Sequence, residues 1–262
     1  MLRSLVISHA NLSIGFNVSE QGTGEWGMHA QRSATVNMEP APDTVSFLLY
    51  PSALQDAAMV QALPKLVTFA EFISWLPEDG CYELHDGTVI AMQPTGQHEA
   101  IAAFLVETFT LEYSRMGLPY RLPAKARIRP PEKESGYLPD VLLVDRRCLP
   151  DEPLWATAST LTQGSSIPLV CEVVSTNWRD DYHLKFADYE ALGIPEYWII
   201  DYAALGGRRL IGDPKQPTIT ICTLIDGEYQ VEQFRGQQPL ISATFPNLTL
   251  TAAQVLQADL ES

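Results

Sequence analysis

The chain has 262 residues, of which 46% are hydrophobic and 19% are charged, and its formal net charge is −15. This composition is typical of a soluble globular protein, and 19 prolines against 16 glycines favour an α/β or α+β protein over a helical bundle. The negative charge argues against broad, sequence-independent adhesion to nucleic acid or to an anionic membrane. Any anionic substrate would need a local basic patch or a metal ion.

Residues 1–58 are rich in Ser, Asn, Gly, Pro and Met and show no sustained helical or strand period. We expect a poorly structured N-terminal extension there and a folded domain over 59–262. The extension contains 2 Lys+Arg and 5 Asp+Glu, so −12 of the total charge of −15 belongs to the folded part.

The folded part begins with a predicted helix and a predicted hairpin. TFAEFISWL has apolar residues at helical spacing, with Thr68 as N-cap and Glu71 completing a capping box. CYELHDGTVIAM predicts two strands around Asp86-Gly87. HEAIAAFLVETFTLEYSRMG then predicts a long amphipathic helix that ends at Gly117.

Three strand-like stretches follow, and a polar loop over about 146–167 separates the last two: YRLPAKARIRP, YLPDVLLVD and PLVCEVV. Next come a helix from Asp180 or Asp181 to Gly193, the strand PEYWIIDY, a second hairpin around Asp226-Gly227 and a short C-terminal helix. This order predicts an α/β (α+β) core with a mixed central sheet flanked by helices. The N-terminal helix-hairpin and the C-terminal β-hairpin are additions to that core.

The cysteines and the lengths of the apolar runs indicate the cellular compartment. Neither a zinc site nor a disulfide framework is indicated, because four widely separated cysteines form no C-x-x-C pair: Cys81, Cys148, Cys171 and Cys222. We expect a cytoplasmic protein. No run of eighteen apolar residues and no signal-peptide cleavage pattern occur, so we expect no membrane span and no export.

Two central strands each carry one carboxylate inside an apolar run, Asp140 and Glu172. A buried unpaired carboxylate is costly. If the strands are neighbours, the two acids lie close enough to bind one hard divalent cation, Mg²⁺ or Mn²⁺, which would neutralise them. The alternatives are a turn or hydrogen-bonding role for Asp140, and a buried ion pair with an arginine for Glu172.

Several cations and one aromatic residue are candidates for substrate contacts. Lys185 shares a helix face with Asp181 and Tyr189, so it either points at a metal-bound water or phosphate or pairs with Asp181 on a solvated surface. Trp178 is either a base-stacking or a packing residue. Three cations at every second position lie on one face of a predicted strand: Lys125, Arg127 and Arg129. This face either binds a phosphate backbone or is simply solvated.

Together these motifs resemble a known family. PD at 139–140, E-x-V at 172–174 and a lysine displaced onto the following helix resemble the PD-(D/E)XK restriction-endonuclease superfamily. More closely, the Uma family of endonuclease-like proteins, formerly a domain of unknown function, is similar over roughly 59–258. The similar stretches are YELHDG, QPTGQH, GYLPDVLLVD, CEVVS, a D-x-x-x-K-x-x-x-Y helix and GIPEYWIIDY. MVQALPKLVTF resembles the start of family members, so we expect Met59 to be the natural start.

The resemblance implies a restriction-endonuclease-like fold and a Mg²⁺- or Mn²⁺-dependent endonuclease acting on nucleic acid, with DNA as the expected substrate. It implies that Asp140 and Glu172 hold the metal and that Lys185 is a migrated catalytic lysine. It also brings Glu83 and His98 to the catalytic site. The alternatives there are a cross-strand ion pair for Glu83 and a helix-start hydrogen bond for His98.

One departure from the superfamily pattern keeps other functions open. Val174 stands where the E-x-K motif has its lysine, and together with the net charge of −15 it favours a catalytically inactive binding or interaction module. A third hypothesis is a metal-dependent hydrolase of a small anionic substrate. Because one site cuts one strand, a homodimer is one possible assembly for an enzyme that cuts a duplex, and the sequence shows no interface.

Overall fold

The computed structural model describes residues 4–7, 12–15, 66–77 and 79–258. Backbone proximity divides the chain into two units, residues 1–59 and 60–262. In the first unit, the strands β1 (Ser4–Ile7) and β2 (Leu12–Gly15) pair antiparallel. The predicted extension over 1–58 otherwise lies outside the described residues.

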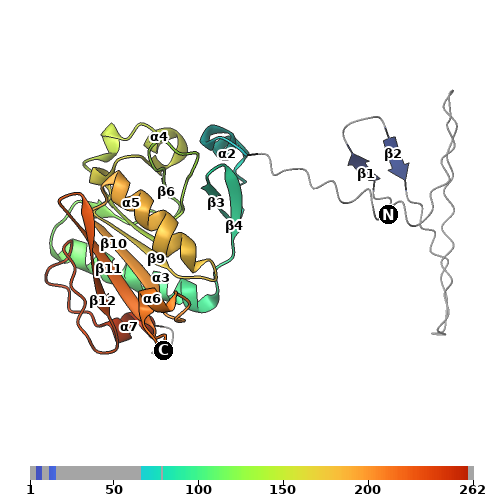
Figure 1. Ribbon diagram of the computed structural model, residues 1–262. Coiled ribbons are helices and arrows are strands. Elements are labelled where there is room, and N and C mark those ends of the chain that lie inside the picture. The colour runs from blue at the N-terminus through green and yellow to red at the C-terminus, as the bar shows by residue number, and fades with distance from the viewer. Residues whose placement is uncertain (1–3, 8–11, 16–65, 78, 259–262) are drawn as a thin grey trace, which may run out of the picture. The chain divides into compact units, whose positions relative to one another are not determined.

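The second unit contains the remaining helices and strands (Figure 1). The helices are α2 (Phe69–Trp75), α3 (Gly96–Arg115), α4 (Trp155–Ala158), α5 (Phe186–Leu192), α6 (Arg208–Ile211) and α7 (Ala252–Leu256). Short 3-10 turns are η2 (Leu149–Asp151) and η3 (Gly164–Ser166), and a π-helical turn is η4 (Asp180–Lys185). The strands are β3 (Cys81–His85), β4 (Thr88–Met92), β5 (Tyr120–Arg121), β6 (Arg127–Ile128), β7 (Val141–Asp145), β8 (Thr160–Leu161), β9 (Leu169–Val173), β10 (Glu196–Asp201), β11 (Thr218–Ile225) and β12 (Glu228–Phe234).

A six-stranded sheet forms the centre of this unit, in the order β12-β11-β10-β9-β7-β5. β9 and β10 run parallel, whereas the other neighbouring strands are antiparallel. Every residue of β7, β9 and β10 is buried, which explains why their sequences are continuous apolar runs rather than alternating ones. The predicted mixed central sheet flanked by helices is confirmed.

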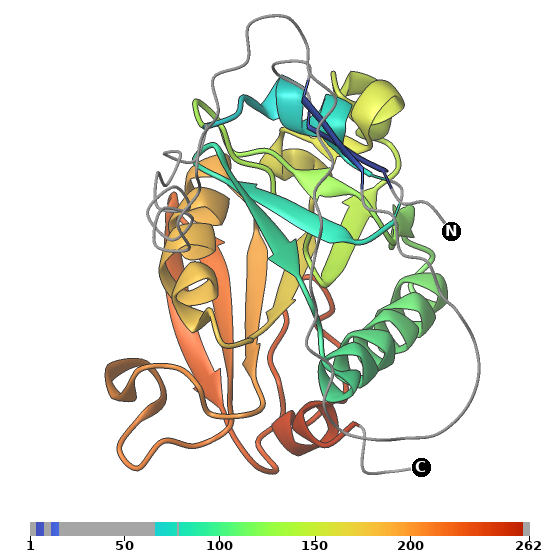
Figure 2. The ribbon, with the colours of Figure 1, turned by 90° about the vertical axis from the view of Figure 1, so that its right-hand side faces the viewer.

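Helices cover both faces of the sheet. Figure 2 shows α5 on one side of the strands and α3 and α7 on the other. Ile101 and Phe109 of α3 pack with Cys171 and Trp198 on one face. Val174 packs on the opposite face, in the apolar cluster that includes side chains of η4 and α5. Because neighbouring residues of a strand point to opposite faces, Glu172 lies under η4 and α5.

The N-terminal helix-hairpin is confirmed. Thr68 and Glu71 form the predicted capping box of α2. The β3–β4 turn has φ of 45° at Asp86 and 81° at Gly87, as a tight Asp-Gly turn requires. Leu84 bridges to Gly136, so the hairpin is tied to the segment that leads into β7.

The stretch 120–130 is not the single strand that its sequence predicts. β5 pairs with β7 in the central sheet, whereas β6 pairs in parallel with β8 in a separate two-stranded sheet. A turn at Ala124 and Lys125 separates the two strands, and Pro123 lacks the N–H that would extend the ladder. The prediction that three cations share one strand face is therefore wrong.

Two other features concern longer stretches of the chain. The predicted polar loop over about 146–167 contains η2, α4, β8 and η3. Within the part of the chain that the structure describes, no helix is long and apolar enough to cross a membrane.

Candidate active site

The two carboxylates predicted as a pair come from neighbouring segments of the sheet, Asp140 directly before β7 and Glu172 within β9. β7 and β9 pair with Val141 opposite Cys171, so the same register extended by one residue sets Asp140 opposite Glu172. Asp140 Oδ2 accepts a hydrogen bond of 2.7 Å from the N–H of Val173. The Asp140 side chain is 18% exposed and Glu172 is 2% exposed, so Asp140 reaches solvent while Glu172 is buried.

Lys185 lies among three carboxylates. Its Nζ is 3.1 Å from Glu83 Oε1, 3.1 Å from Glu172 Oε2 and 3.6 Å from Asp181 Oδ1. Its side chain is 2% exposed, so the interpretation of Lys185 as half of a solvated surface pair is wrong. We call Glu83, Glu172, Asp181 and Lys185 the carboxylate-lysine cluster.

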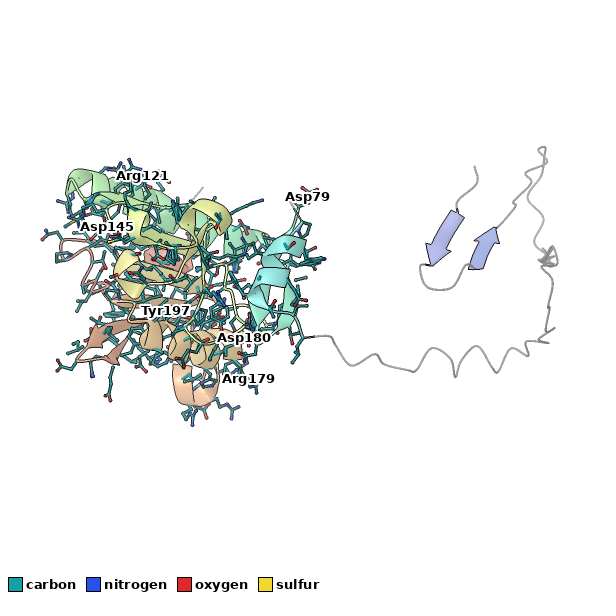
Figure 3. The ribbon with its side chains drawn as sticks, turned by 90° about the horizontal axis from the view of Figure 1, so that it is seen from above. Asp79, Arg121, Asp145, Arg179, Asp180 and Tyr197 are labelled. Carbon is teal, nitrogen blue, oxygen red and sulfur yellow. The ribbon has the colours of Figure 1, made fainter. Side chains whose placement is uncertain are left out.

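The position of Lys185 also bears on the missing lysine of the E-x-K motif. Val174, at that position, is fully buried in the apolar cluster on the same face. Lys185 instead reaches Glu172 from η4, which begins at Asp180, labelled in Figure 3 beside Arg179. A π-helical turn of this kind frequently occurs at functional sites.

Glu172 has two partners, neither of them an arginine. Oε2 faces Lys185, and Oε1 accepts a hydrogen bond of 2.6 Å from the hydroxyl of Tyr189 on α5. The hypothesis of a buried arginine pair is therefore wrong. Sequence reasoning placed Tyr189 on the face of Lys185 but did not assign it this contact.

The β3–β4 hairpin contributes Glu83, whose two carboxylate oxygens are both engaged. Oε1 accepts from the N–H of Leu138 at 2.9 Å and faces Lys185, and Oε2 lies 2.7 Å from His85 Nε2. Glu83 therefore forms no cross-strand ion pair, because its register partner is Ile90. Sequence reasoning missed His85, although a histidine two residues from Glu83 lies on the same strand face.

His98 lies at the start of α3 and faces Asp140. Its backbone N–H bonds to the N-cap Thr95, and its Nε2 is 3.3 Å from Asp140 Oδ2. Burial lowers the pKa of His98, but the hydrogen bond to Asp140 and its charge outweigh burial, so the pKa lies above its usual value. His98 is thus favoured as a cation that orients Asp140. Its Nδ1 is buried without a partner.

Within the carboxylate-lysine cluster, the pKa values of two acids are raised and that of the third is lowered. Burial, with Asp140 and Glu83 nearby, raises the pKa of Glu172 well above its usual value despite Lys185. The same causes raise the pKa of Asp181 to about 7. Burial also opposes ionisation of Glu83, but Lys185, His85 and the Leu138 N–H outweigh it and lower the pKa to about 2. The surrounding carboxylates outweigh burial at Lys185 and hold its pKa well above the usual value.

A pocket of about 520 Å³ brings most of the predicted catalytic residues together. Its lining includes Glu83, His98, Asp140 and Lys185, whereas Glu172 is not among the lining residues. Glu172 therefore lies behind the pocket wall, in contact with it through Lys185. We call this cavity the Asp140 pocket.

The site offers few protein ligands for a hard divalent cation. Among the described residues, no three side chains of His, Cys, Asp or Glu are grouped so that they could share one metal ion. Mg²⁺, however, is commonly held by one or two carboxylates together with waters and substrate phosphates. Asp140 presents one carboxylate to the pocket, and Glu172, opposite it on the neighbouring strand, is the second carboxylate that would hold such a cation, although in this arrangement it lies behind the pocket wall.

The predicted nucleic-acid contacts are dispersed. Arg127 is 7% exposed, with its guanidinium over the ring of Phe72, and Arg129 stacks 4.5 Å from the ring centroid of Phe69. Lys125 is exposed in the turn before β6. Trp178 is half-buried, with Arg179 stacked 4.5 Å from its ring centroid. The ring contacts of the buried Arg127 and the partly buried Arg129 join α2 to the segment around β6.

Comparisons with known proteins agree with this architecture. A search among curated proteins finds no significant match. A solved structure titled as a "putative nuclease belonging to DUF820" from Anabaena variabilis has the same fold, with a TM-score of 0.57 and 17% identity, and the match covers 74% of this chain and 99% of that chain. The sequence model of the family named Uma2 and described as "Putative restriction endonuclease" matches residues 69–253. The chain therefore belongs to the Uma2 family, and its core is restriction-endonuclease-like.

Proposed function

We propose that this protein is a metal-dependent endonuclease that hydrolyses phosphodiester bonds of nucleic acid, with DNA as the expected substrate. The observation that carries the proposal is that Asp140 and Lys185 line one pocket while Lys185 Nζ lies 3.1 Å from Glu172. Three residue types that phosphodiester hydrolysis uses, two acids and a lysine, thus come together from three different elements. Membership of the Uma2 family supports the same reaction class.

Asp140 and Glu172 are the residues that would hold Mg²⁺ or Mn²⁺. When bound, such a cation supplies Lewis-acid chemistry, because it stabilises negative charge on the phosphate and on the attacking oxygen. Asp140 presents its carboxylate to the pocket, and His98 orients it through the contact at 3.3 Å. Glu172 is fixed from behind by the Tyr189 hydroxyl.

Lys185 stays protonated, because three carboxylates surround it and hold its pKa well above the usual value. A protonated lysine donates hydrogen bonds but accepts no proton. Its role in this proposal is therefore to stabilise charge on the phosphate rather than to act as a general base. Glu83 positions Lys185, because its carboxylate is itself fixed by Leu138 and His85.

One observation favours a second candidate, a nuclease-fold module that binds nucleic acid without cutting it. Glu172 is 2% exposed and does not line the Asp140 pocket. A protein that keeps this arrangement at all times would bind a cation through Asp140 alone. Cleavage assays separate the two candidates.

The test uses plasmid DNA, single-stranded DNA and RNA with the full chain in Mn²⁺ or Mg²⁺, and in chelator. We expect metal-dependent cleavage that Asp140→Asn lowers about a hundredfold or more, the scale for losing a group that stabilises the transition state. Glu99→Gln is the matched control, because Glu99 lines the same pocket but belongs to no proposed metal pair. If wild-type protein binds nucleic acid but cuts none of the three substrates, the non-catalytic module replaces the nuclease.

A further inference from the structure

The reactive groups of the proposed site are recessed. The side chains of Glu83, Glu172 and Lys185 are 1–2% exposed, and Asp140 is 18% exposed. The Asp140 pocket measures about 520 Å³, and cavities of about 300–1,000 Å³ hold single small ligands. A phosphodiester must therefore enter the pocket to reach these groups, rather than lie across the protein surface.

The wall of the pocket combines apolar and amide groups. Met92 from β4, Ala102 from α3 and Leu138 before β7 are apolar lining residues, and Gln93 and Asn177 bring carboxamides. A nucleobase presents apolar faces and hydrogen-bonding edges, and an unpaired base exposes both. The pocket thus has groups for each part of a nucleotide: an apolar wall, two amides and the phosphate-directed Lys185.

The pocket offers few cations, which suits the single phosphate of one nucleotide better than the several phosphates of a duplex. Proteins that bind paired DNA neutralise several phosphates with lysines and arginines. Among the described residues that line the pocket, Lys185 is the single lysine or arginine, and it stands against five carboxylates: Glu83, Glu99, Asp140, Asp180 and Asp181. Arg127 and Arg129 are stacked on Phe72 and Phe69 instead of forming an open row.

We propose that the Asp140 pocket takes one unpaired nucleotide, so that the substrate is single-stranded or looped nucleic acid. The base lies against Met92, Ala102 and Leu138, and the phosphate lies toward Asp140 and Lys185. The cleavage of this strand rests on the proposed function, whereas its binding does not. In a duplex the same nucleotide would first have to leave its stack, which costs free energy, so paired DNA binds more weakly.

The test measures binding by fluorescence anisotropy of labelled oligonucleotides that share one sequence, in Ca²⁺ so that binding is followed without cleavage. The probes are single-stranded DNA, single-stranded RNA, duplex DNA and a duplex with an unpaired central loop. We expect at least one of the two single strands to bind at least about tenfold more tightly than the duplex. The looped duplex should also bind at least about tenfold more tightly than the fully paired one. The DNA and RNA arms identify the sugar. Equal or tighter binding of the duplex overturns the inference.

Two variants locate the binding. Ala91→Trp fills the pocket from an exposed position of β4, where an aromatic residue suits a strand. Ala103→Trp is the matched control, because Ala103 is exposed on α3 and is not a lining residue. We expect Ala91→Trp to weaken single-strand binding about tenfold or more and Ala103→Trp to leave it unchanged. Unchanged binding in Ala91→Trp also overturns the inference. Cleavage with Mn²⁺ is scored separately, and its absence rejects the nuclease alone.

Discussion

The charge balance around Lys185 decides what each neighbouring acid can do. One ammonium group faces Glu83, Glu172 and Asp181, and Asp140 lies close enough to raise the pKa of both Glu172 and Asp181. If all four acids were ionised, one lysine would leave the site with an excess of negative charge, which is why the pKa values of Glu172 and Asp181 are raised. A bound divalent cation would relieve that excess, and this gives the proposed metal site a measurable effect on stability.

We predict that Mg²⁺ or Mn²⁺ raises the melting temperature of the wild-type protein, because a cation that binds only the folded state stabilises it by about 2.7 kcal/mol at a hundredfold excess over Kd. Asp140→Asn and Glu172→Gln should each abolish that rise. Thermal denaturation with and without metal measures it. In the absence of metal, Asp140→Asn keeps the hydrogen bond from Val173 and loses both the repulsion from the neighbouring acids and the charge that faces His98, so its stability should stay close to that of the wild type.

Glu99→Gln provides the matched control for this experiment. Glu99 is an exposed carboxylate in the same pocket, so its loss should leave the metal-induced rise in place. A rise that persists in Asp140→Asn but disappears in Glu99→Gln would move the cation to another part of the pocket. No rise in the wild type would leave Glu172 with a structural role only.

Asp181 should make stability depend on pH. Burial raises its pKa from 3.8 to about 7 in the folded protein. The folded state therefore holds a proton that the unfolded state has lost, so this contribution is present below about pH 4 and is lost as pH rises through about 7. Between these values, the stability of the wild type relative to Asp181→Asn should fall by up to about 1.4 kcal/mol per pH unit.

Chemical denaturation of both proteins from pH 4.5 to 8 measures this difference. Asp180→Asn is the neighbouring control, because the Asp180 side chain is 34% exposed. A constant difference between wild type and Asp181→Asn across this range would show that Asp181 titrates alike in the folded and unfolded states.

At the scale of elements, the end of α5 packs unusually close to η3. A Cβ added at Gly164 would lie 2.6 Å from the carbonyl oxygen of Gly193 and would also meet the carbonyl of Leu192. Backbone atoms cannot move aside as a flexible side chain can. Gly164→Ala should therefore destabilise the protein by about 1–3 kcal/mol, the range for overpacking, as measured by chemical denaturation.

Gly96→Ala is the control for this substitution, because a Cβ there meets nothing within 4 Å. Gly96 begins α3, where alanine has the better helix propensity, so stability should stay equal or rise. Equal effects of the two substitutions would contradict the close approach of η3 to α5.

The elements that the sequence predicts well are those defined by local interactions. Thr68 with Glu71, and the two Asp-Gly turns, need only residues a few positions apart, and all three occur as predicted. The stretch 120–130 is different, because β6 forms only by pairing with β8, more than thirty residues later. No local pattern contains that partner. The stretch that looks like one strand is therefore divided between two sheets.

The same distinction applies to the site. Asp140 and Glu172 were predictable as a pair, since each acid interrupts an apolar strand and the strands are neighbours. The burial of Lys185 was not, because it depends on Glu83, which comes from a hairpin about a hundred residues away in sequence. The contact of His85 with Glu83 was missed although the two residues are only two positions apart. Its contact with Glu83 gains meaning only once Glu83 is known to hold Lys185.

At the scale of the whole molecule, the chain divides at about residue 60, and the family match begins at 69. The segment just before α2 is part of the folded unit. The N–H of Val67 bonds to the carbonyl of Gly87 at 2.8 Å, and the Thr68 hydroxyl caps α2. These two contacts join α2 to the hairpin that carries Glu83.

We therefore predict different outcomes for two truncated chains. A chain that begins at residue 60 should keep the melting temperature of the full protein, whereas one that begins at residue 69 should lose about 1–2 kcal/mol, because it lacks the N-cap of α2 and the Val67 bond. For a domain of this size, that loss lowers the melting temperature by about 2–8 °C.

Limited proteolysis of the full chain should yield a stable fragment that begins between residues 59 and 66. A chain from residue 60 that melts as early as the chain from residue 69 would mean that the first 59 residues stabilise the fold. Because the lost contacts anchor the hairpin, the chain from residue 69 should also bind substrate less tightly, as Glu83 would no longer hold Lys185 at the pocket.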